Sequence, residues 1–257
     1  MNKVAKAVYS FILAVSLSLV PLSQARQIRP PKGFDGKVYK GSLALYASSE
    51  QIGVTDKFIC SAQVIAKVQG GYELLSAGHC TPANTQELPS DMTFKVATDL
   101  GESLMPVTLV AAKMEEPVDW AVYYFPTNKD FPVIPLGDEG DIRINDKTVD
   151  VNYSLALAKE VSLGVVSSTV QAQGDMKGFF EVTQFDSHGA SGSSVISERT
   201  KKVIGIVIAG VDGTTTPTWV EPASVISKEI EKVNVASNIP FSPKPSGKEN
   251  LESIPVW

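Results

Sequence analysis

Residues 58–80 read FICSAQVIAKVQGGYELLSAGHC and contain two stretches of strand-forming residues, at 58–68 and 72–76. Val, Ile and Phe are frequent in the first stretch and Tyr and Leu in the second, and glycines at the turn separate the two. Similar short stretches follow along the chain, at 105–111, 120–125, 147–158, 161–171, 178–183, 193–197 and 203–209. The pattern predicts an all-β sandwich or barrel fold with little helix.

Two segments interrupt this strand pattern. A proline-containing stretch at 126–135 divides the strand-rich region into halves of similar size, and we take it as the connection between two barrels, at 37–125 and 136–221. The second segment is 222–233, where a proline opens a run of apolar residues at helical spacing, which predicts a short amphipathic helix. The remaining residues, 234–257, are rich in Pro, Ser and Lys, and we expect a disordered tail.

The first 25 residues have the form of an export signal. Lys3 and Lys6 give a positive start, residues 7–20 form an apolar run too short to span a bilayer, and Ser23 and Ala25 suit a cleavage site. An uncleaved membrane anchor is the alternative. Cleavage would leave a secreted or periplasmic protein that begins with an N-terminal segment, 26–36, and has no stable membrane span.

The charge balance argues against nucleic acid as a partner. The 257 residues include 23 Lys and Arg and 28 Asp and Glu, and loss of Lys3 and Lys6 leaves 21 basic residues against 28 acidic ones, a formal net charge of -7. An acidic chain without basic blocks binds nucleic acid poorly. Its length suits one medium-sized enzyme or two small barrels with a shared interface, and we expect a monomer.

Cys60 and Cys80 are the only cysteines. Export would place them where disulfides persist, so a disulfide is the natural inference, and closing a loop of about 20 residues stabilises a fold by roughly 3 kcal/mol. Two free thiols or metal ligands are the alternative. That alternative is weaker because the two histidines complete no regularly spaced zinc quartet.

Three segments carry residues that could perform chemistry. His79 follows an apolar strand, and an imidazole is the usual general base near neutral pH. Ser191 lies in a turn of small residues, where its Oγ can be exposed and backbone N–H groups can converge on an oxyanion. Asp119 stands at the mouth of an apolar strand, where unpaired charges are rare. Taken singly, each has a structural alternative: a histidine without a catalytic role, a plain Gly/Ser turn, and a strand-edge turn residue.

Together these segments resemble the chymotrypsin-like serine peptidase family, in its bacterial-type secreted form. The family's base and the cysteine after it match SAGHC at 76–80, and its partner cysteine matches FICSA at 58–62. Its aspartate matches DWAV at 119–122, and its nucleophile matches GASG at 189–192. The chain order His, Asp, Ser also agrees, whereas an α/β-hydrolase would need a histidine after the serine. The resemblance covers most of 37–233.

The resemblance implies two packed six-stranded antiparallel β-barrels with a short C-terminal helix. It implies a secreted serine endopeptidase that hydrolyses peptide bonds through an acyl-enzyme, with His79, Asp119 and Ser191 as its triad and the N–H groups of Gly189 and Ser191 as its oxyanion hole. The partner would be a peptide or protein substrate, and no metal or organic cofactor is required. The residues expected at the substrate pocket are Phe185, Asp186, His188, Val207, Ile208, Ala209 and Gly210.

Several residues depart from the family's animal digestive members. Ala190 replaces the Asp of their activation latch, so we expect an enzyme that is active once the signal is removed. Phe185 stands where trypsin-like members carry an Asp, which predicts no strong preference for Arg or Lys, although a loop shift would bring in Asp186. An exposed histidine without a role is the alternative for His188. The alternative function is a catalytically silent peptidase homologue that binds a peptide or protein in its cleft.

Overall fold

The structure is a computed structural model that describes residues 36–81, 89–115, 118–156, 158–171, 177–210 and 217–237. The expected export signal, residues 26–35 of the N-terminal segment and the tail beyond residue 237 lie outside the described residues. In the described ranges, no helix is long and apolar enough to cross a membrane.

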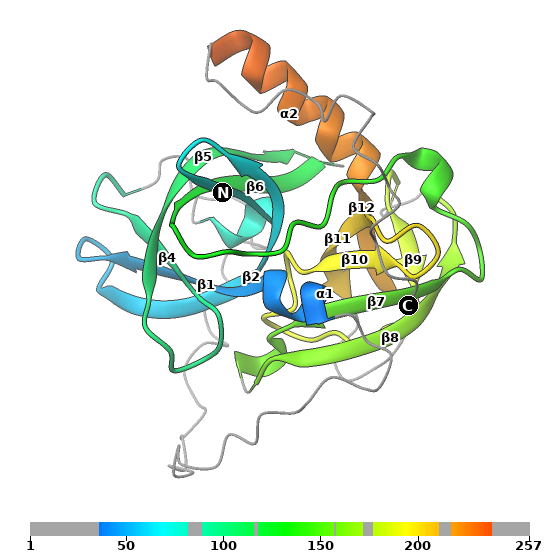
Figure 1. Ribbon diagram of the computed structural model, residues 1–257, viewed down its shortest axis with the longest axis horizontal. Coiled ribbons are helices and arrows are strands. Elements are labelled where there is room, and N and C mark those ends of the chain that lie inside the picture. Colours follow the sequence, from blue (N-terminus) through cyan, green and yellow to red (C-terminus); the bar gives the residue numbers. More distant parts are fainter. Residues whose placement is uncertain are drawn as a thin grey trace, which may run out of the picture.

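Six antiparallel strands close the first barrel, on the left of Figure 1. They are β1 (Ser42–Ser49), β2 (Val54–Val68), β3 (Gly71–Ser76), β4 (Thr93–Ala97), β5 (Met105–Glu115) and β6 (Val118–Pro126), hydrogen-bonded in the order β1-β2-β3-β6-β5-β4. Trp120, Tyr123 and Phe125 of β6 are buried in one cluster with Leu74 and Leu75 of β3. Burying each such apolar side chain stabilises the fold by roughly 1.5–3 kcal/mol.

Six further strands close the second barrel, on the right of Figure 1. They are β7 (Lys147–Asn152), β8 (Glu160–Ser168), β9 (Phe180–Val182), β10 (Ser194–Ser197), β11 (Val203–Gly210) and β12 (Thr218–Pro222), in the order β10-β11-β12-β9-β8-β7. Two closed six-stranded barrels confirm the fold class predicted from the sequence.

The two barrels share side chains and hydrogen bonds at their interface. Ile206 of β11 belongs to the apolar core of the first barrel. The Ser42 Oγ of β1 donates to the Val151 carbonyl of β7 at 2.5 Å, and the buried Tyr153 donates through its hydroxyl to the Thr98 carbonyl at 2.9 Å. These contacts fix the position of each barrel relative to the other.

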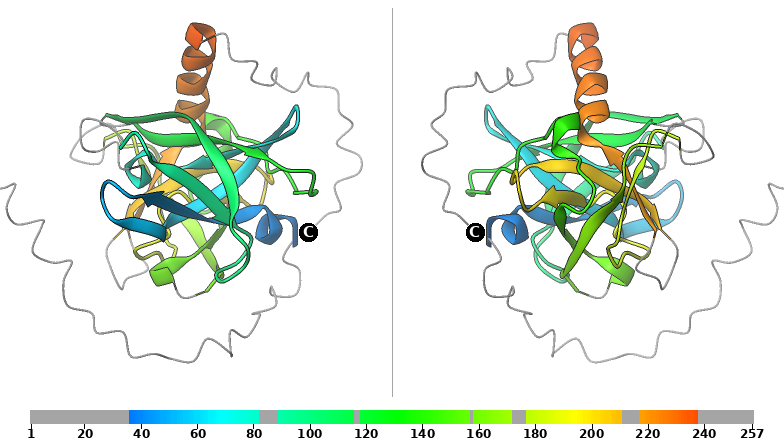
Figure 2. Two further views of the ribbon diagram at one scale, coloured as in Figure 1. Left: turned by 90° about the vertical axis from the view of Figure 1, so that its left-hand side faces the viewer. Right: turned by 90° about the vertical axis from the view of Figure 1, so that its right-hand side faces the viewer.

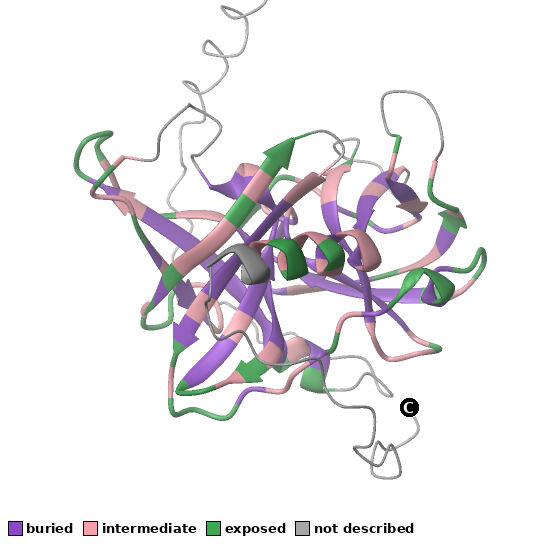
Figure 3. Ribbon diagram, turned by 90° about the horizontal axis from the view of Figure 1, so that it is seen from above, coloured by how far each residue is buried: buried purple, intermediate pink, exposed green. Residues whose placement is uncertain are grey.

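Two α-helices accompany the barrels. α1 (Gly36–Gly41) precedes β1, and α2 (Ala223–Ser237) follows β12 and projects from the body of the molecule (Figure 2). Seen from above, α2 carries exposed residues along its outer side (Figure 3). Compared with the predicted helix at 222–233, α2 starts one residue later, because Pro222 ends β12, and runs to Ser237, so the predicted tail begins as helix.

The strand predictions need three further corrections. Strands β1, β4 and β12 and helix α1 were not predicted, because β1 is rich in Ser and Ala and the other three elements are short. The predicted strand 147–158 ends at Asn152, because Leu155 and Ala156 adopt left-handed backbone, with φ of 56° and 53°. The predicted strand 161–171 begins at Glu160 and ends at Ser168.

Candidate active site

His79 lies in η2 (Gly78–Cys80), a short helical turn after β3. Gly78 packs so closely that an added Cβ would lie 2.3 Å from the Lys113 carbonyl oxygen and 2.8 Å from the Asp119 Oδ1. Only glycine fits this position without displacing backbone. The close packing brings the His79 turn against β5 and β6.

Asp119, the second residue of β6, accepts two hydrogen bonds from His79. The His79 Nδ1 lies 2.6 Å from Asp119 Oδ2, and the His79 backbone N–H donates to Oδ1 at 2.7 Å. The two side chains are 28% and 13% exposed, so this contact is largely shielded from water. A carboxylate at Nδ1 favours the tautomer that carries its proton there, which leaves the Nε2 lone pair free to accept a proton.

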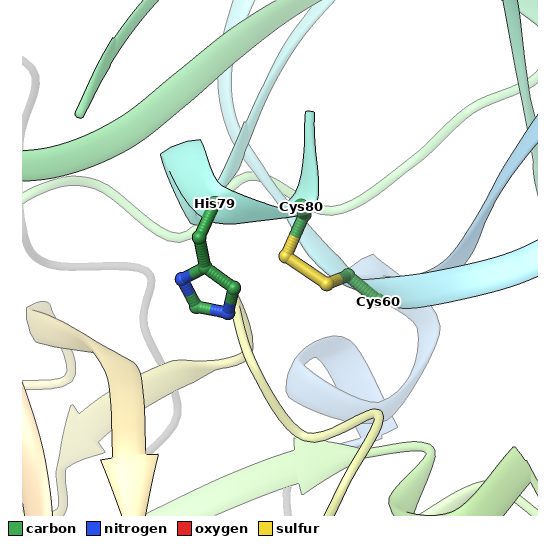
Figure 4. A group of neighbouring side chains, drawn as sticks. All are labelled: Cys60, His79 and Cys80. Carbon is green, nitrogen blue, oxygen red and sulfur yellow. A yellow bond between two sulfur atoms is a disulfide. The ribbon is translucent and has the colours of Figure 1, made fainter. Parts of the chain in front are cut away.

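A disulfide joins Cys60 of β2 to Cys80 of η2, with a Cα–Cα distance of 6.0 Å. Figure 4 shows the imidazole of His79 and the disulfide extending from the same turn. Ligand atoms of Cys60, His79 and Cys80 lie within 4.8 Å of one another, but a metal needs thiolates and both sulfurs are bonded. The predicted disulfide is confirmed, and its metal-ligand alternative is wrong.

The loop that carries Ser191 is bonded to the strand beside this disulfide. The Ser61 N–H donates to the Ser191 carbonyl at 3.0 Å, and the Gly192 N–H donates to the Val207 carbonyl of β11 at 2.9 Å. Gly192 has a φ of +79°, and an added Cβ would lie 2.7 Å from the Ala77 nitrogen. The serine loop therefore packs directly on the segment that leads into His79.

Ser191 itself is partly buried. Among the described residues, its Oγ makes no hydrogen bond, either to His79 or to any other group. In unliganded active sites the contact between nucleophile and base is often long and tightens when substrate binds. The structure thus joins His79 to Asp119 by hydrogen bonds and brings the Ser191 loop beside them.

A strained turn orients the peptide bond before Gly189. The Leu155 N–H donates to the His188 carbonyl at 2.6 Å, and Leu155 and Ala156 are both left-handed. Because C=O and N–H point in opposite directions in a trans peptide, the Gly189 N–H points away from Leu155. Neither this N–H nor that of Ser191 has an acceptor in the described ranges, so both are free to bind an oxyanion.

The predicted pocket residues differ in accessibility. Phe185 is 41% exposed, and its N–H donates to the Ser162 Oγ at 2.9 Å. Asp186 is 3% exposed, and it accepts a hydrogen bond from Asn152. Of the others, His188 and Gly210 are exposed, Ile208 and Ala209 are half-buried, and Val207 is buried. The Asp186 carboxyl thus faces the interior of the second barrel.

Two buried acids, Asp150 and Glu221, carried no prediction, and Asp186, expected at the substrate pocket, lies beside the first of them. Asn152 Nδ2 donates to Asp150 at 2.7 Å and to Asp186 at 3.0 Å, bridging two buried carboxyl groups. Burial raises the pKa of Asp186 to about 6, and burial and the Asp186 charge raise the pKa of Asp150 well above its usual range. Asp150 and Glu221 interrupt apolar strands, the same signal that pointed to Asp119.

Known proteins resemble this chain in a domain family and in the fold. A family model described as a trypsin-like peptidase domain matches residues 60–206. No curated protein sequence matches the chain. Among solved structures, the HtrA-type protease AlgW with a tripeptide has a TM-score of 0.59 at 18% identity, over 78% of this chain and 62% of that one.

Two further solved structures have similar scores. AlgW with a decapeptide has a TM-score of 0.61 at 17% identity, over 79% of this chain and 66% of that one. A serine endoprotease from Yersinia pestis has a TM-score of 0.56 at 19% identity, over 77% and 64%. At these identities the likeness shows a shared fold, and this chain spans 62% to 66% of the length of the three structures.

Proposed function

Since this chain belongs to the trypsin-like peptidase domain family, we propose that it is a serine endopeptidase with His79, Asp119 and Ser191 as its catalytic triad. The observation that carries the proposal is the double hydrogen bond from His79 to Asp119, at 2.6 Å and 2.7 Å. A carboxylate in this position fixes the imidazole tautomer and stabilises the imidazolium that forms during acyl transfer.

The proposed reaction has two halves. The Ser191 Oγ attacks the carbonyl carbon of a peptide bond while His79 Nε2 takes the Oγ proton, and the oxyanion binds the N–H groups of Gly189 and Ser191. The C–N bond then breaks, and His79 gives its proton to the leaving amine. Water next attacks the acyl-enzyme, loses a proton to His79 and releases the acid, and the proton returns to Ser191.

The proposed site of action is outside the cytoplasm. Residues 1–25 have the pattern of an export signal, and the Cys60–Cys80 disulfide suits an oxidising compartment. We therefore propose a secreted or periplasmic enzyme that needs no second cleavage, because Ala190 leaves no acidic partner for a new amino terminus.

The proposed substrates are peptides or proteins, without a strong preference for Arg or Lys before the cleaved bond. Two observations support this exclusion. Phe185 stands where trypsin-like members carry their acidic residue, and the neighbouring Asp186 carboxyl is buried and bonded to Asn152. A buried, hydrogen-bonded carboxyl does not reach a substrate side chain.

A fluorophosphonate probe tests the proposed function directly, because it reacts with a serine activated by an adjacent base. Wild type and the loop control Ser187→Ala should be labelled, and Ser191→Ala should not. Circular dichroism should confirm that each protein is folded. If folded wild type stays unlabelled, the proposed enzyme function is wrong and a silent homologue is favoured; if Ser191→Ala is labelled, another residue is the nucleophile.

A further inference from the structure

Glu221 is a buried carboxyl that the proposed mechanism does not use. It lies near the end of β12, opposite Ile206 of β11, and its side chain is fully buried. Its Oε2 accepts the backbone N–H of Asp119 at 2.9 Å. A residue of the second barrel therefore holds the backbone of the residue that bonds His79.

The atoms of Glu221 indicate which protonation state the site suits. Its Oε1 is buried and has no hydrogen-bond partner among the described residues. An ionised carboxylate would leave negative charge uncompensated at that atom, whereas a protonated carboxyl leaves only a hydroxyl, which costs less to bury. Burial accordingly raises the pKa of Glu221 to about 8.

Charged groups from three other elements surround Glu221. The hydrogen bond from the Asp119 N–H and the charge of Lys113 on β5 lower its pKa, the negative charges of Asp119 on β6 and Glu229 on α2 raise it, and burial outweighs them all. Lys113 is committed elsewhere, because its Nζ lies 3.0 Å from Glu229 and 3.6 Å from Glu115. Glu221 is linked to His79 through Asp119, which bonds both residues.

We propose that Glu221 is a positioning residue of the active site, which in its neutral form holds the Asp119 backbone so that the Asp119 carboxylate meets His79. This inference rests on the proposed triad. Asp119 is then held through its backbone by the second barrel, while its side chain bonds the first-barrel turn that carries His79. Because the clamp crosses the barrel interface, it also ties the triad to the relative position of the barrels.

The role requires a neutral acceptor. Asp119 must be ionised to stabilise an imidazolium, and a second carboxylate bonded to its own backbone would repel that charge. A neutral Glu221 provides the acceptor without this repulsion. Glutamine provides the same acceptor and cannot ionise, so it should replace Glu221, whereas alanine should not.

The test compares Glu221→Gln and Glu221→Ala by the rate constant of fluorophosphonate labelling. Near neutral pH, Glu221→Ala should react about 10- to 100-fold more slowly than wild type, because a small displacement of a catalytic group has a cost of this order. Glu221→Gln should recover most of that loss. Glu73→Gln is the matched control. Burial raises the pKa of Glu73 to about 7, as it raises that of Glu221, but Glu73 lies opposite Tyr124 in the sheet, five residues along β6 from Asp119.

The pH profile separates positioning from simple stabilisation. The wild-type rate should fall as pH rises through about 8, where Glu221 ionises, and Glu221→Gln should lack that fall. A Glu221→Ala protein that reacts like wild type, or a Glu221→Gln protein with the same alkaline fall, would overturn the proposal. If Glu221→Ala does not fold, the profile of Glu221→Gln still decides. Unlabelled wild type would instead refute the triad itself.

Discussion

Replacing Asp119 with asparagine should nearly abolish activity while the fold stays intact. The reason lies in the two hydrogen bonds from His79, which reach different oxygens of the carboxylate, at 2.7 Å from the backbone N–H and at 2.6 Å from Nδ1. Asparagine has one oxygen and one NH2 group. Because a backbone N–H can only donate, it selects the asparagine oxygen and leaves the NH2 facing Nδ1.

That orientation forces the wrong histidine tautomer. Nδ1 must then accept a hydrogen bond, so the imidazole proton moves to Nε2, which can no longer take the proton of the Ser191 Oγ. In enzymes with this triad the same substitution lowers kcat by about 10⁴, which corresponds to about 5.4 kcal/mol of transition-state stabilisation. We expect a loss of the same order here.

The assay is the second-order rate of fluorophosphonate labelling, together with hydrolysis of fluorescently labelled casein. Asp130→Asn is the control, because the Asp130 side chain is 94% exposed and has only long contacts, with the Lys67 Nζ at 3.8 Å and the Tyr72 hydroxyl at 3.3 Å. Asp119→Asn should melt near the wild-type temperature. If it kept more than about a hundredth of the wild-type rate, the tautomer argument would be wrong.

Three other changes should alter stability. The raised pKa values of Asp150 and Asp186 mean that the native state holds more protons than the unfolded chain above about pH 4, so wild type should lose stability as pH rises toward about 6 and beyond. Measured by urea unfolding, the free energy of unfolding of Asp150→Asn should fall less over that pH range. If it fell in parallel with that of wild type, the raised pKa of Asp150 would be wrong. Leu155→Gly should raise the free energy of unfolding by about 1 kcal/mol by relieving a left-handed backbone, and an unchanged melting temperature would argue against strain there. Replacing Cys60 and Cys80 with serine should lower the unfolding free energy by roughly 3 kcal/mol, visible as an earlier denaturant midpoint; an unchanged midpoint would show that the disulfide adds nothing.

The strands that sequence predicted well are those with their own strong preference. β2, β6 and β11 are rich in Val, Ile, Tyr and Phe, β3 is rich in Tyr and Leu, and the structure places all four within a few residues of the predicted bounds. β1 is rich in Ser and Ala rather than in the β-branched and aromatic residues that favour strands, and β4 and β12 have only five residues each, too few to show a clear pattern. They become strands because hydrogen-bonded neighbours on both sides close each barrel.

The candidate site likewise has residues that the sequence predicts and residues that only the folded structure connects to it. His79, Asp119 and Ser191 could be proposed as catalytic residues from the sequence, because each stands in a short motif next to a strand. Glu221 and Asp150 carried a weaker signal, an acid inside an apolar strand, which does not tell which groups surround it, and Asp186 was expected at the substrate pocket instead of beside Asp150. Only the folded chain brings the Glu221 carboxyl to the Asp119 N–H, 102 residues away.

By itself, the sequence determined the barrel class, the cysteine pair and the order of the three candidate catalytic residues, since these depend on residue type and spacing within short segments. The tertiary structure alone decided the double contact between His79 and Asp119, the left-handed turn at Leu155 and the carboxyl behind Asp119. Those features join segments that are distant in the chain, and hydrogen-bond direction and burial become defined only when the two barrels pack.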